Sequence, residues 1–272
     1  FSPRINYKLS SQDKNTTFRL SAGNGFRVAN VFTEDHAALT GARDVIFAEE
    51  LKPEQSWNVN ANLVKKIYTD NGTFIGLDGS AFYTYFTNRI IPDYESNPNQ
   101  IIYANLNGSA VSKGISLNLD AAWANGLTVT AGGTLMDVSI EEEGIRTRQL
   151  LTERFSGVWS VGYEFFRSGL TVDYTGNVYS PMRLPLLGPL DDRPAYSTWY
   201  SLQNIQLTKT LGEKWEIYGG VKNLLNFTPP ANSIARAFDP FDKNALTFDP
   251  TYVFAPNQGI RGFLGVRFTV SD

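Results

Sequence analysis

Hydrophobic and polar residues alternate with a period of two along most of the chain. In RFSGVWSVGYEFF, Arg154 to Phe166, large apolar side chains occupy one phase, and mainly small or polar residues occupy the other. Such alternation is typical of β-strands whose two faces touch different media, whereas apolar stripes at i, i+3, i+4 and i+7 indicate helices. Convincing helical stripes are absent from the sequence. The pattern therefore predicts an all-β protein.

Eleven strands are expected, joined alternately by short turns and long loops. The expected strands cover about 1–9, 15–23, 54–68, 73–88, 112–124, 126–139, 152–166, 169–180, 198–210, 214–226 and 259–270. The long loops are expected at 24–53, 89–111, 140–151, 181–197 and 227–258. Asn71-Gly72 and Asn125-Gly126 are hairpin signals, because both residue types tolerate the positive φ of a tight turn. Consecutive strands should therefore be antiparallel neighbours.

Two architectures produce this alternation, a soluble β-sandwich and a transmembrane β-barrel. Long strands, short turns that all fall at one end, and aromatic residues near strand ends favour the barrel. The aromatic residues expected at the membrane interfaces are Tyr7, Trp57, Tyr68, Trp123, Trp159, Trp199 and Trp215. On the barrel interpretation, Phe155, Trp159, Val161 and Phe165 face lipid, and Ser156, Ser160 and Glu164 face the lumen.

Composition narrows the class of protein further. The 272 residues carry a formal net charge of −3 and a sequence pI near 5.3, so the chain has no overall basic surface for nucleic acid. It contains no cysteine, which excludes disulfides and cysteine chemistry. No window approaches 18 uninterrupted apolar residues, which excludes a transmembrane helix.

An eleven-strand meander leaves the barrel incomplete. An odd number of strands puts the first strand's start and the last strand's end on opposite sides, whereas a closed antiparallel barrel needs an even number. Open edges in lipid would leave unpaired backbone groups at a cost of several kcal/mol each, on the order of tens of kcal/mol in total. We therefore expect additional strands, from residues outside this sequence or from another chain.

Several motifs resemble those of TonB-dependent outer-membrane receptors. GNGFRVANVF (23–32) is similar to the family's Gly-x-Gly-Phe-Arg-x-Pro-x-Phe motif, and LKPEQSWNVNANL (51–63) resembles its Pro-Glu-x-Ser strand start. YGGVKNLLNFTPP (218–230) resembles its Val-x-Asn-Leu-Phe-Asn motif, FSPRINY (1–7) its Ser-Pro-Arg strand, and GVRFTV (265–270) the assembly signal of outer-membrane proteins. The chain departs from these patterns at Ala29, at Leu225 and in its final Ser271-Asp272.

The resemblance implies a 22-stranded barrel preceded by a plug domain. Residues 1–272 would then be the C-terminal part of the barrel domain, with the plug and the N-terminal strands outside this sequence. The implied location is the bacterial outer membrane. The implied partners are the TonB complex, reached through the missing N-terminal part, the remaining strands and plug, the lipid bilayer and a small-molecule chelate.

Catalytic chemistry is not indicated, and no enzyme activity, cofactor or protein metal site is expected. The only histidine, His36, is either a loop ligand for a metal chelate or an incidental loop residue. Substrate recognition is expected in the long loops and the upper lumen, where cations would pair with an anionic chelate and aromatic rings would stack on a planar one. The candidates are Phe26, Arg27, Asp35, His36, Tyr94, Tyr179, Arg183, Arg236, Phe238, Asp239 and Phe241.

The function that the resemblance implies is active import of a scarce nutrient, with an iron–siderophore chelate as the leading substrate. Cobalamin and sugars are alternative substrates within the same family. A passive porin-like barrel and a soluble β-sandwich binding module remain as alternatives of other classes.

Overall fold

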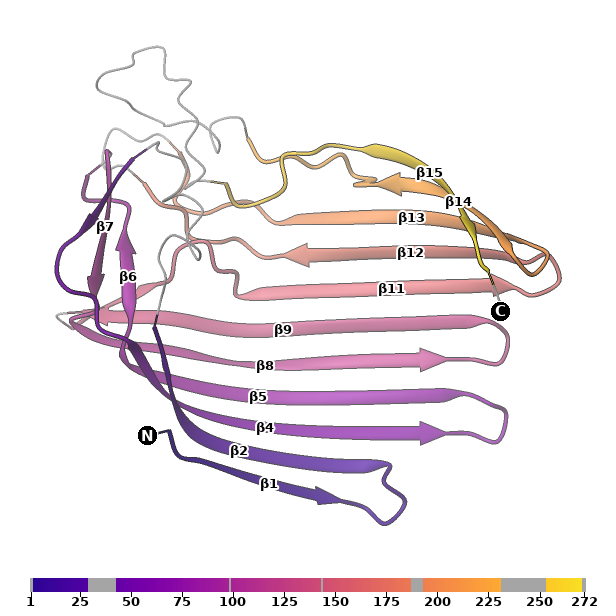
Figure 1. The fold of residues 1–272 in the computed structure, drawn as a ribbon, viewed down its shortest axis with the longest axis horizontal. Coiled ribbons are helices and arrows are strands. Elements are labelled where there is room, and N and C mark those ends of the chain that lie inside the picture. Colours follow the sequence, from indigo (N-terminus) through magenta and orange to yellow (C-terminus); the bar gives the residue numbers. More distant parts are fainter. Residues whose placement is uncertain are drawn as a thin grey trace.

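The computed structural model describes residues 2–28, 43–97, 99–142, 144–186, 193–230 and 253–270. Its main feature is one antiparallel sheet in which eleven strands follow one another in chain order (Figure 1). These are β1 (Arg4–Ser10), β2 (Thr16–Arg27), β4 (Glu54–Tyr68), β5 (Phe74–Asn88), β8 (Gly108–Ala122), β9 (Leu127–Glu142), β11 (Phe155–Phe165), β12 (Leu170–Tyr179), β13 (Tyr200–Leu211), β14 (Trp215–Lys222) and β15 (Arg261–Phe268). β10 (Ile145–Arg148) adds a short twelfth strand beside β9. The expected eleven-strand meander is confirmed.

The short turns gather at one end of the sheet and the long connections at the other (Figure 1). Gly72 and Gly126 have φ angles of +78° and +91°, as the two hairpin signals require. A Cβ at Gly126 would also lie 2.5 Å from the Glu164 carbonyl oxygen, so close packing excludes a side chain there. Local backbone chemistry therefore fixes the turn end of the sheet.

Strand register keeps the alternating phases aligned across the whole sheet. Ile115 of β8 lies opposite Ala81 of β5 and Leu135 of β9, so one apolar face continues from strand to strand. The same register puts the expected lipid-facing residues of β11 on this face and its expected lumen-facing residues on the other. Leu264, which belongs to the apolar face near the other edge, is 81% exposed. We call these the apolar and polar faces.

Side chains on the polar face are hydrogen-bonded to one another across strands. Arg19 donates to Asn62 at 3.0 Å, and the Asn62 amide donates to Asp78 at 2.8 Å. Thr130 donates to Asp120 at 2.9 Å. These polar contacts are suited to a wet lumen, where water satisfies the remaining donors and acceptors.

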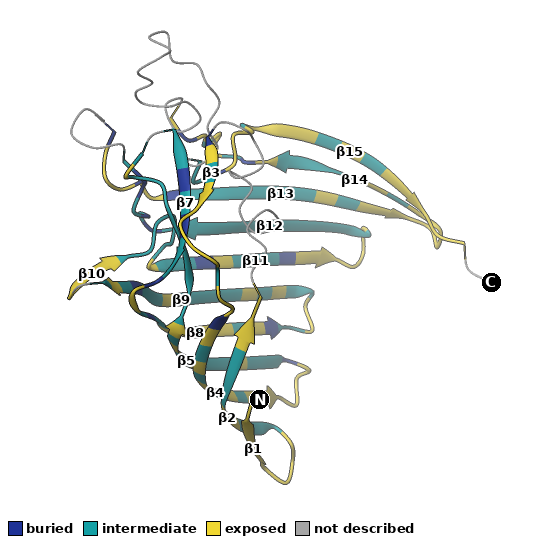
Figure 2. Cartoon of the chain, turned by 60° about the vertical axis from the view of Figure 1, so that its left-hand side comes forward, coloured by how far each residue is buried: buried dark blue, intermediate teal, exposed yellow. Residues whose placement is uncertain are grey.

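The sheet itself is a single layer with little buried core (Figure 2). The two clusters of buried hydrophobic residues, one around Ile101 and Tyr103 and the other around Met182, Tyr200 and Ala255, lie at the long-loop end. A soluble sandwich would cover its apolar face, yet Ile5 is 76% and Leu117 67% exposed. An apolar surface that spans eleven strands far exceeds what water-soluble monomers expose, so this face requires lipid.

Aromatic residues mark the strand ends only in part as expected. Trp57, Tyr68, Trp123, Trp199 and Trp215 lie near strand ends. Tyr7 and Trp159 lie within β1 and β11, three and four residues from the nearer strand end, and their placement at the interface stays a prediction. Trp159 fills the space above Gly176, where a Cβ would come within 2.3 Å of its indole ring. Its position is therefore set by packing across strands.

A second, three-stranded sheet at the long-loop end was not expected from the sequence. β3 (Asp44–Phe47) pairs in parallel with β7 (Gln100–Asn105), which pairs antiparallel with β6 (Ile90–Asp93). Val45, Leu51, Ile90 and Tyr94 pack against its buried Ile101 and Tyr103. Two loops that are far apart in sequence are thus joined into one unit, which we call the loop sheet.

Some strands end earlier than expected, at points where side chains instead of a neighbouring strand form hydrogen bonds with the backbone. β14 stops at Lys222 because Asn223 and Asn226 adopt φ angles of +54° and +50°. The Asn223 amide then donates to the Phe227 and Gln258 carbonyl oxygens.

Among the described residues, no helix has the length and hydrophobicity of a membrane span.

Candidate functional site

Two cavities meet at the long-loop end of the polar face. The smaller, of about 320 Å³, is lined by Gly25, Phe26, Arg27, Glu54, Ser56, Phe86 and Arg89. The larger, of about 470 Å³, lies among β6, β7, the end of β9, residues 147–151 and Arg183. Arg89 lines both cavities and is therefore the residue that connects them.

A β-bulge aims Arg89 at the polar face. On β5 the residues of that face are Phe82, Thr84 and Phe86, and simple alternation would add Asn88 next. The register with β4 shifts instead, so that Asn88 lies opposite Gln55. A bulge of this kind reverses the alternation beyond it. Arg89 thereby takes the inward position at the rim.

The Arg89 guanidinium is only partly satisfied. Its Nη2 donates to Gln149 Oε1 at 2.7 Å, and its Cζ lies 5.1 Å from the centre of the Phe86 ring. Its Nη1 is buried and has no hydrogen-bond partner among the described residues. Burial lowers the pKa of Arg89 from its ordinary value, and the Glu54 carboxylate opposes that shift. An arginine remains charged in proteins, so a buried N–H donor faces the cavities.

Arg27 is held by an ion pair with its cross-strand partner. Its Nη2 and Nε lie 2.6 and 3.0 Å from Glu54 Oε2, and Glu54 Oε1 accepts the Ile90 backbone N–H at 3.1 Å. Glu54 is buried, whereas the Arg27 side chain is 59% exposed. The pair joins β2, β4 and the first residue of β6. Phe26, next to it, is 64% exposed at the rim.

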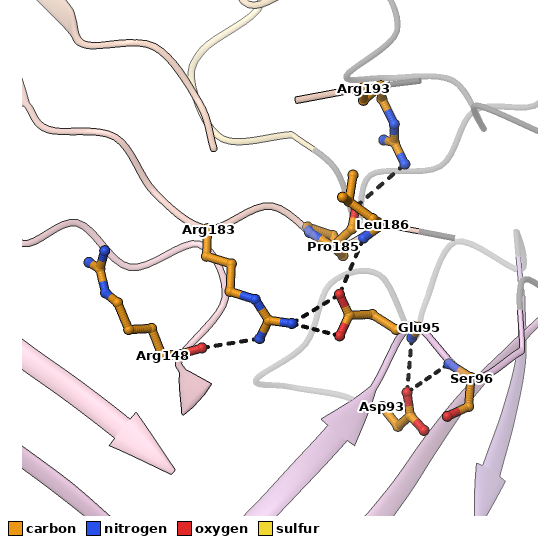
Figure 3. Close-up of polar contacts among 8 residues, drawn as sticks. All are labelled: Asp93, Glu95, Ser96, Arg148, Arg183, Pro185, Leu186 and Arg193. Carbon is orange, nitrogen blue, oxygen red and sulfur yellow. Dashed lines mark hydrogen bonds and ion pairs between the residues drawn. The ribbon is translucent and has the colours of Figure 1, made fainter. Parts of the chain in front are cut away.

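Arg183 ties a third loop to the larger cavity (Figure 3). Its Nη2 contacts Glu95 Oε2 at 2.9 Å and Oε1 at 3.2 Å, and its Nη1 donates to the Arg148 carbonyl oxygen at 3.2 Å. Glu95 Oε1 also accepts the Leu186 N–H at 3.4 Å. The cation thus serves as a clamp between the loop that follows β12 and the loop sheet.

Asp93 shapes the turn that presents Glu95 (Figure 3). Its Oδ1 accepts the backbone N–H groups of Glu95 at 2.9 Å and Ser96 at 3.0 Å. Burial raises the pKa of Asp93, but hydrogen bonds from Ser96 and Glu95 outweigh it, so the net pKa is lower than usual. The turn is therefore built on a charged carboxylate.

The two candidate tyrosines pack mainly against protein. The Tyr94 ring borders the core of the loop sheet. The Tyr94 backbone carbonyl oxygen accepts a hydrogen bond from Arg43 Nη1 at 2.8 Å. Tyr179 stacks on Tyr200, with centroids 5.0 Å apart, and Tyr200 stacks on Phe227 at the same distance. Tyr94 still lines the larger cavity.

The structure thus brings Phe26 and Arg27 together in one cavity and Tyr94 and Arg183 in the other. Arg89 joins the two cavities, and the sequence did not single it out. The other candidates, Asp35, His36, Arg236, Phe238, Asp239 and Phe241, lie outside the described residues. In the described part of the chain, no group of three acidic, histidine or cysteine residues could hold a metal ion.

Comparison with known proteins identifies the family. The sequence model of one protein family, described as TonB-dependent receptor-like β-barrel, matches residues 1–224. No curated protein sequence matches the chain.

Solved receptors share the fold at low sequence identity. The ferric-catecholate import receptor Fiu from E. coli K12 is similar with a TM-score of 0.64 at 11% identity, over 98% of this chain and 34% of that one. The FrpB iron transporter from Neisseria meningitidis gives a TM-score of 0.65 at 14% identity, with coverages of 97% and 38%. The copper transporter OprC gives 0.67 at 12% identity, with coverages of 98% and 39%.

The chain covers only part of the length of these receptors. It spans between a third and two fifths of the length of the three receptors. Barrels of this family are bacterial outer-membrane proteins and act in transport without being enzymes. The family match, the meandering sheet and the two opposed faces agree, and the chain belongs to the TonB-dependent receptor β-barrel family.

Proposed function

We propose that the chain is the C-terminal part of the barrel of an outer-membrane importer, and that its substrate is an anionic iron chelate. The observation that carries this proposal is the buried Nη1 of Arg89, which has no hydrogen-bond partner in the described part of the chain and lies where two rim cavities meet. A buried donor without a partner is costly unless a ligand supplies an acceptor. An anionic ligand supplies a strong one, because hydrogen bonds between ions are about twice as strong as neutral ones.

The sheet supports completion of the barrel by additional strands. β1 and β15 end the strand order, and the described residues supply no further strand beside either edge. Unpaired backbone groups cost several kcal/mol each in lipid. The remaining strands and a plug domain from outside this sequence would close the wall and obstruct the lumen.

Import would draw energy from the inner membrane through TonB. The substrate would bind at the long-loop end, the TonB complex would pull on the part that contains the plug, and the substrate would pass along the polar face into the periplasm. Fiu and FrpB, which are an iron-chelate receptor and an iron transporter by description, support an iron chelate as cargo. OprC shows that the same fold also serves copper.

Uptake by the full-length protein tests the proposal. Cells that carry it as their only such receptor should accumulate ⁵⁵Fe from a ferric-catecholate or ferric-hydroxamate chelate, and deletion of TonB should abolish the accumulation. Uptake of cyanocobalamin or maltooligosaccharide in place of iron would keep the importer and remove the iron assignment. Diffusion of small solutes that does not depend on TonB would indicate a passive porin and contradict active import.

A further inference from the structure

The polar face of the main sheet becomes apolar at its long-loop end. Strand register puts Phe86 of β5 opposite Ala110 of β8, and Ala110 opposite Ile140 of β9, so these three residues form one row across the face. Ala110 is 1% exposed. Phe86 lines the smaller rim cavity and Ile140 lines the larger one, so the apolar row runs from one cavity to the other.

The loop sheet also presents apolar residues to the larger cavity. Ile91 pairs with Ala104, and Asp93 pairs with Ile102, so alternation puts all four residues on one face of the loop sheet. All four line the larger cavity. The opposite face carries the buried core around Ile101. The loop sheet is therefore largely apolar on both faces, although its own core needs only one of them.

The two cavities differ in charge. The smaller cavity is lined by Arg27, Arg89 and Glu54, which give two positive charges and one negative charge. The larger cavity is lined by as many cations as carboxylates, namely Arg89, Arg148, Arg183, Asp93, Glu95 and Glu142. Its formal charges cancel, and Arg183 already holds Glu95 at 2.9 Å. An anionic group is therefore favoured in the smaller cavity, and the larger cavity is left for an uncharged group.

The size and shape of the larger cavity suit an alkyl or aryl group. Its volume of about 470 Å³ is in the range of small-molecule sites, which are mostly apolar with a few polar groups. Leu150 and Leu151 add aliphatic side chains to the lining. The Leu151 N–H donates to the Arg183 carbonyl oxygen at 2.8 Å, so a contact with a second loop fixes this wall of the cavity.

We propose that the larger cavity binds an uncharged apolar arm of the imported chelate, while Arg89 holds the anionic iron centre of the same molecule. The substrate is then an amphiphilic chelate, with its arm against Ile102, Ala104 and Ile140. Each methylene group that the cavity buries contributes about a fourfold gain in affinity, before the cost of ordering the arm. This inference rests on the proposed function and adds the apolar arm to it.

Binding of matched ferric chelates to the full-length receptor in detergent tests the apolar arm. Two anionic centres are used, a tris-catecholate and a citrate dihydroxamate. Each carries one amide arm, which is acetyl, octanoyl, or an acyl chain of the octanoyl length that ends in a carboxylate. By isothermal titration, the octanoyl chelate should bind at least about tenfold more tightly than the acetyl chelate. The carboxylate arm should give no such gain, because the cavity would have to bury its charge.

Two variants locate the arm in the larger cavity. Ala104→Trp fills the cavity from the loop sheet, and Leu150→Gln keeps the side-chain length but makes the lining polar. Both should abolish the octanoyl advantage and leave binding of the acetyl chelate unchanged, which also shows that they fold. The matched control is Ala48→Trp, at an exposed position directly after β3, and it should keep the octanoyl advantage.

The possible failures can be told apart. Equal affinities of the wild type for the octanoyl and acetyl chelates would overturn the apolar arm and leave the anionic chelate in place. An octanoyl advantage that persists in both variants would put the arm outside the larger cavity and would also overturn the inference. Binding of none of the chelates would contradict the proposed function, and the apolar arm with it.

Discussion

Arg89 and Gln149, 60 residues apart in the chain, are joined by a 2.7 Å hydrogen bond from Nη2 to Oε1 that spans the gap between two loops. The bond fixes the guanidinium plane and directs the other terminal nitrogen, Nη1, to where it has no partner among the described residues. The site is therefore organised before any ligand arrives, which lowers the entropic cost of binding.

Replacement of Arg89 tests its assignment as the anion contact. Arg89→Gln should weaken binding of an anionic iron chelate by about tenfold or more, because a hydrogen bond to a charged group contributes about 1.5–3 kcal/mol. Isothermal titration of the full-length receptor measures the change. Arg167→Gln, in the short turn after β11, is the matched control and should bind like the wild type. Equal affinities for the two variants would remove Arg89 from the site.

The Arg27–Glu54 pair should stabilise the rim more than an exposed pair does. Glu54 is buried and also accepts the Ile90 N–H, so Glu54→Gln should lower the free energy of unfolding by about 1–3 kcal/mol. Glu216→Gln removes the 2.5 Å contact with Arg267, whose side chain is 64% exposed, and should cost less than about 1 kcal/mol. Urea unfolding in detergent compares them, and a larger loss for Glu216→Gln would contradict this ranking.

An added charge should destabilise the protein much more on one face of β8 than on the other. Leu117→Arg places a cation in the middle of the apolar face and should destabilise the membrane-inserted barrel by about 2–4 kcal/mol. Asn118→Arg, one residue further along on the polar face, should cost much less. Folding into lipid vesicles measures both variants. If Leu117→Arg were neutral, as expected for a side chain 67% exposed to water, the apolar face would not contact lipid.

Packing between Trp159 and Gly176 should tolerate no added side chain. Gly176→Ala brings a Cβ within 2.3 Å of the indole, so the ring must move, at a cost of about 1–3 kcal/mol. Tryptophan fluorescence should shift together with the unfolding midpoint. Gly133→Ala, on the same face, meets only Phe155 at 3.5 Å and should leave both measurements unchanged.

The Asp93 turn should make the loop sheet sensitive to acid. The pKa of Asp93 in the folded state lies below its ordinary value of 3.8, so its contribution is complete above that value and is lost as the pH falls through the lowered pKa. The protection factors against hydrogen exchange of residues 90–97 and 99–105, which correct for the pH dependence of intrinsic exchange, should therefore be constant from pH 7 to about 5 and fall below about pH 4. Asp93→Asn should remove this pH dependence, and an unchanged profile would assign it to other groups.

The strands of the main sheet could be predicted well from the sequence, because the alternation of apolar and polar residues and the turn residues are local signals. The expected range 54–68 coincides with β4, and Asn71-Gly72 and Asn125-Gly126 form the expected turns. Each strand of the main sheet pairs with the next one along the chain, so the strand order could be predicted without long-range information.

The site was less predictable because long-range contacts build it. The bulge that turns Arg89 inward depends on the register with Gln55 and leaves no mark in the local pattern. The parallel pairing of Asp44 with Gln100 joins segments 56 residues apart. Tyr94 and Tyr179 are expected from the sequence to contact the substrate, but whether an aromatic ring packs on protein or faces a cavity depends on neighbours that the sequence does not specify.

The loop sheet has a mechanical consequence for the mouth of the receptor. β3 comes from one loop, β6 and β7 come from another, and the Arg183–Glu95 contact fastens a third loop to them. A force applied to any one of these loops is therefore shared by all three, and the entrance should open as one hinged cap instead of as separate flaps.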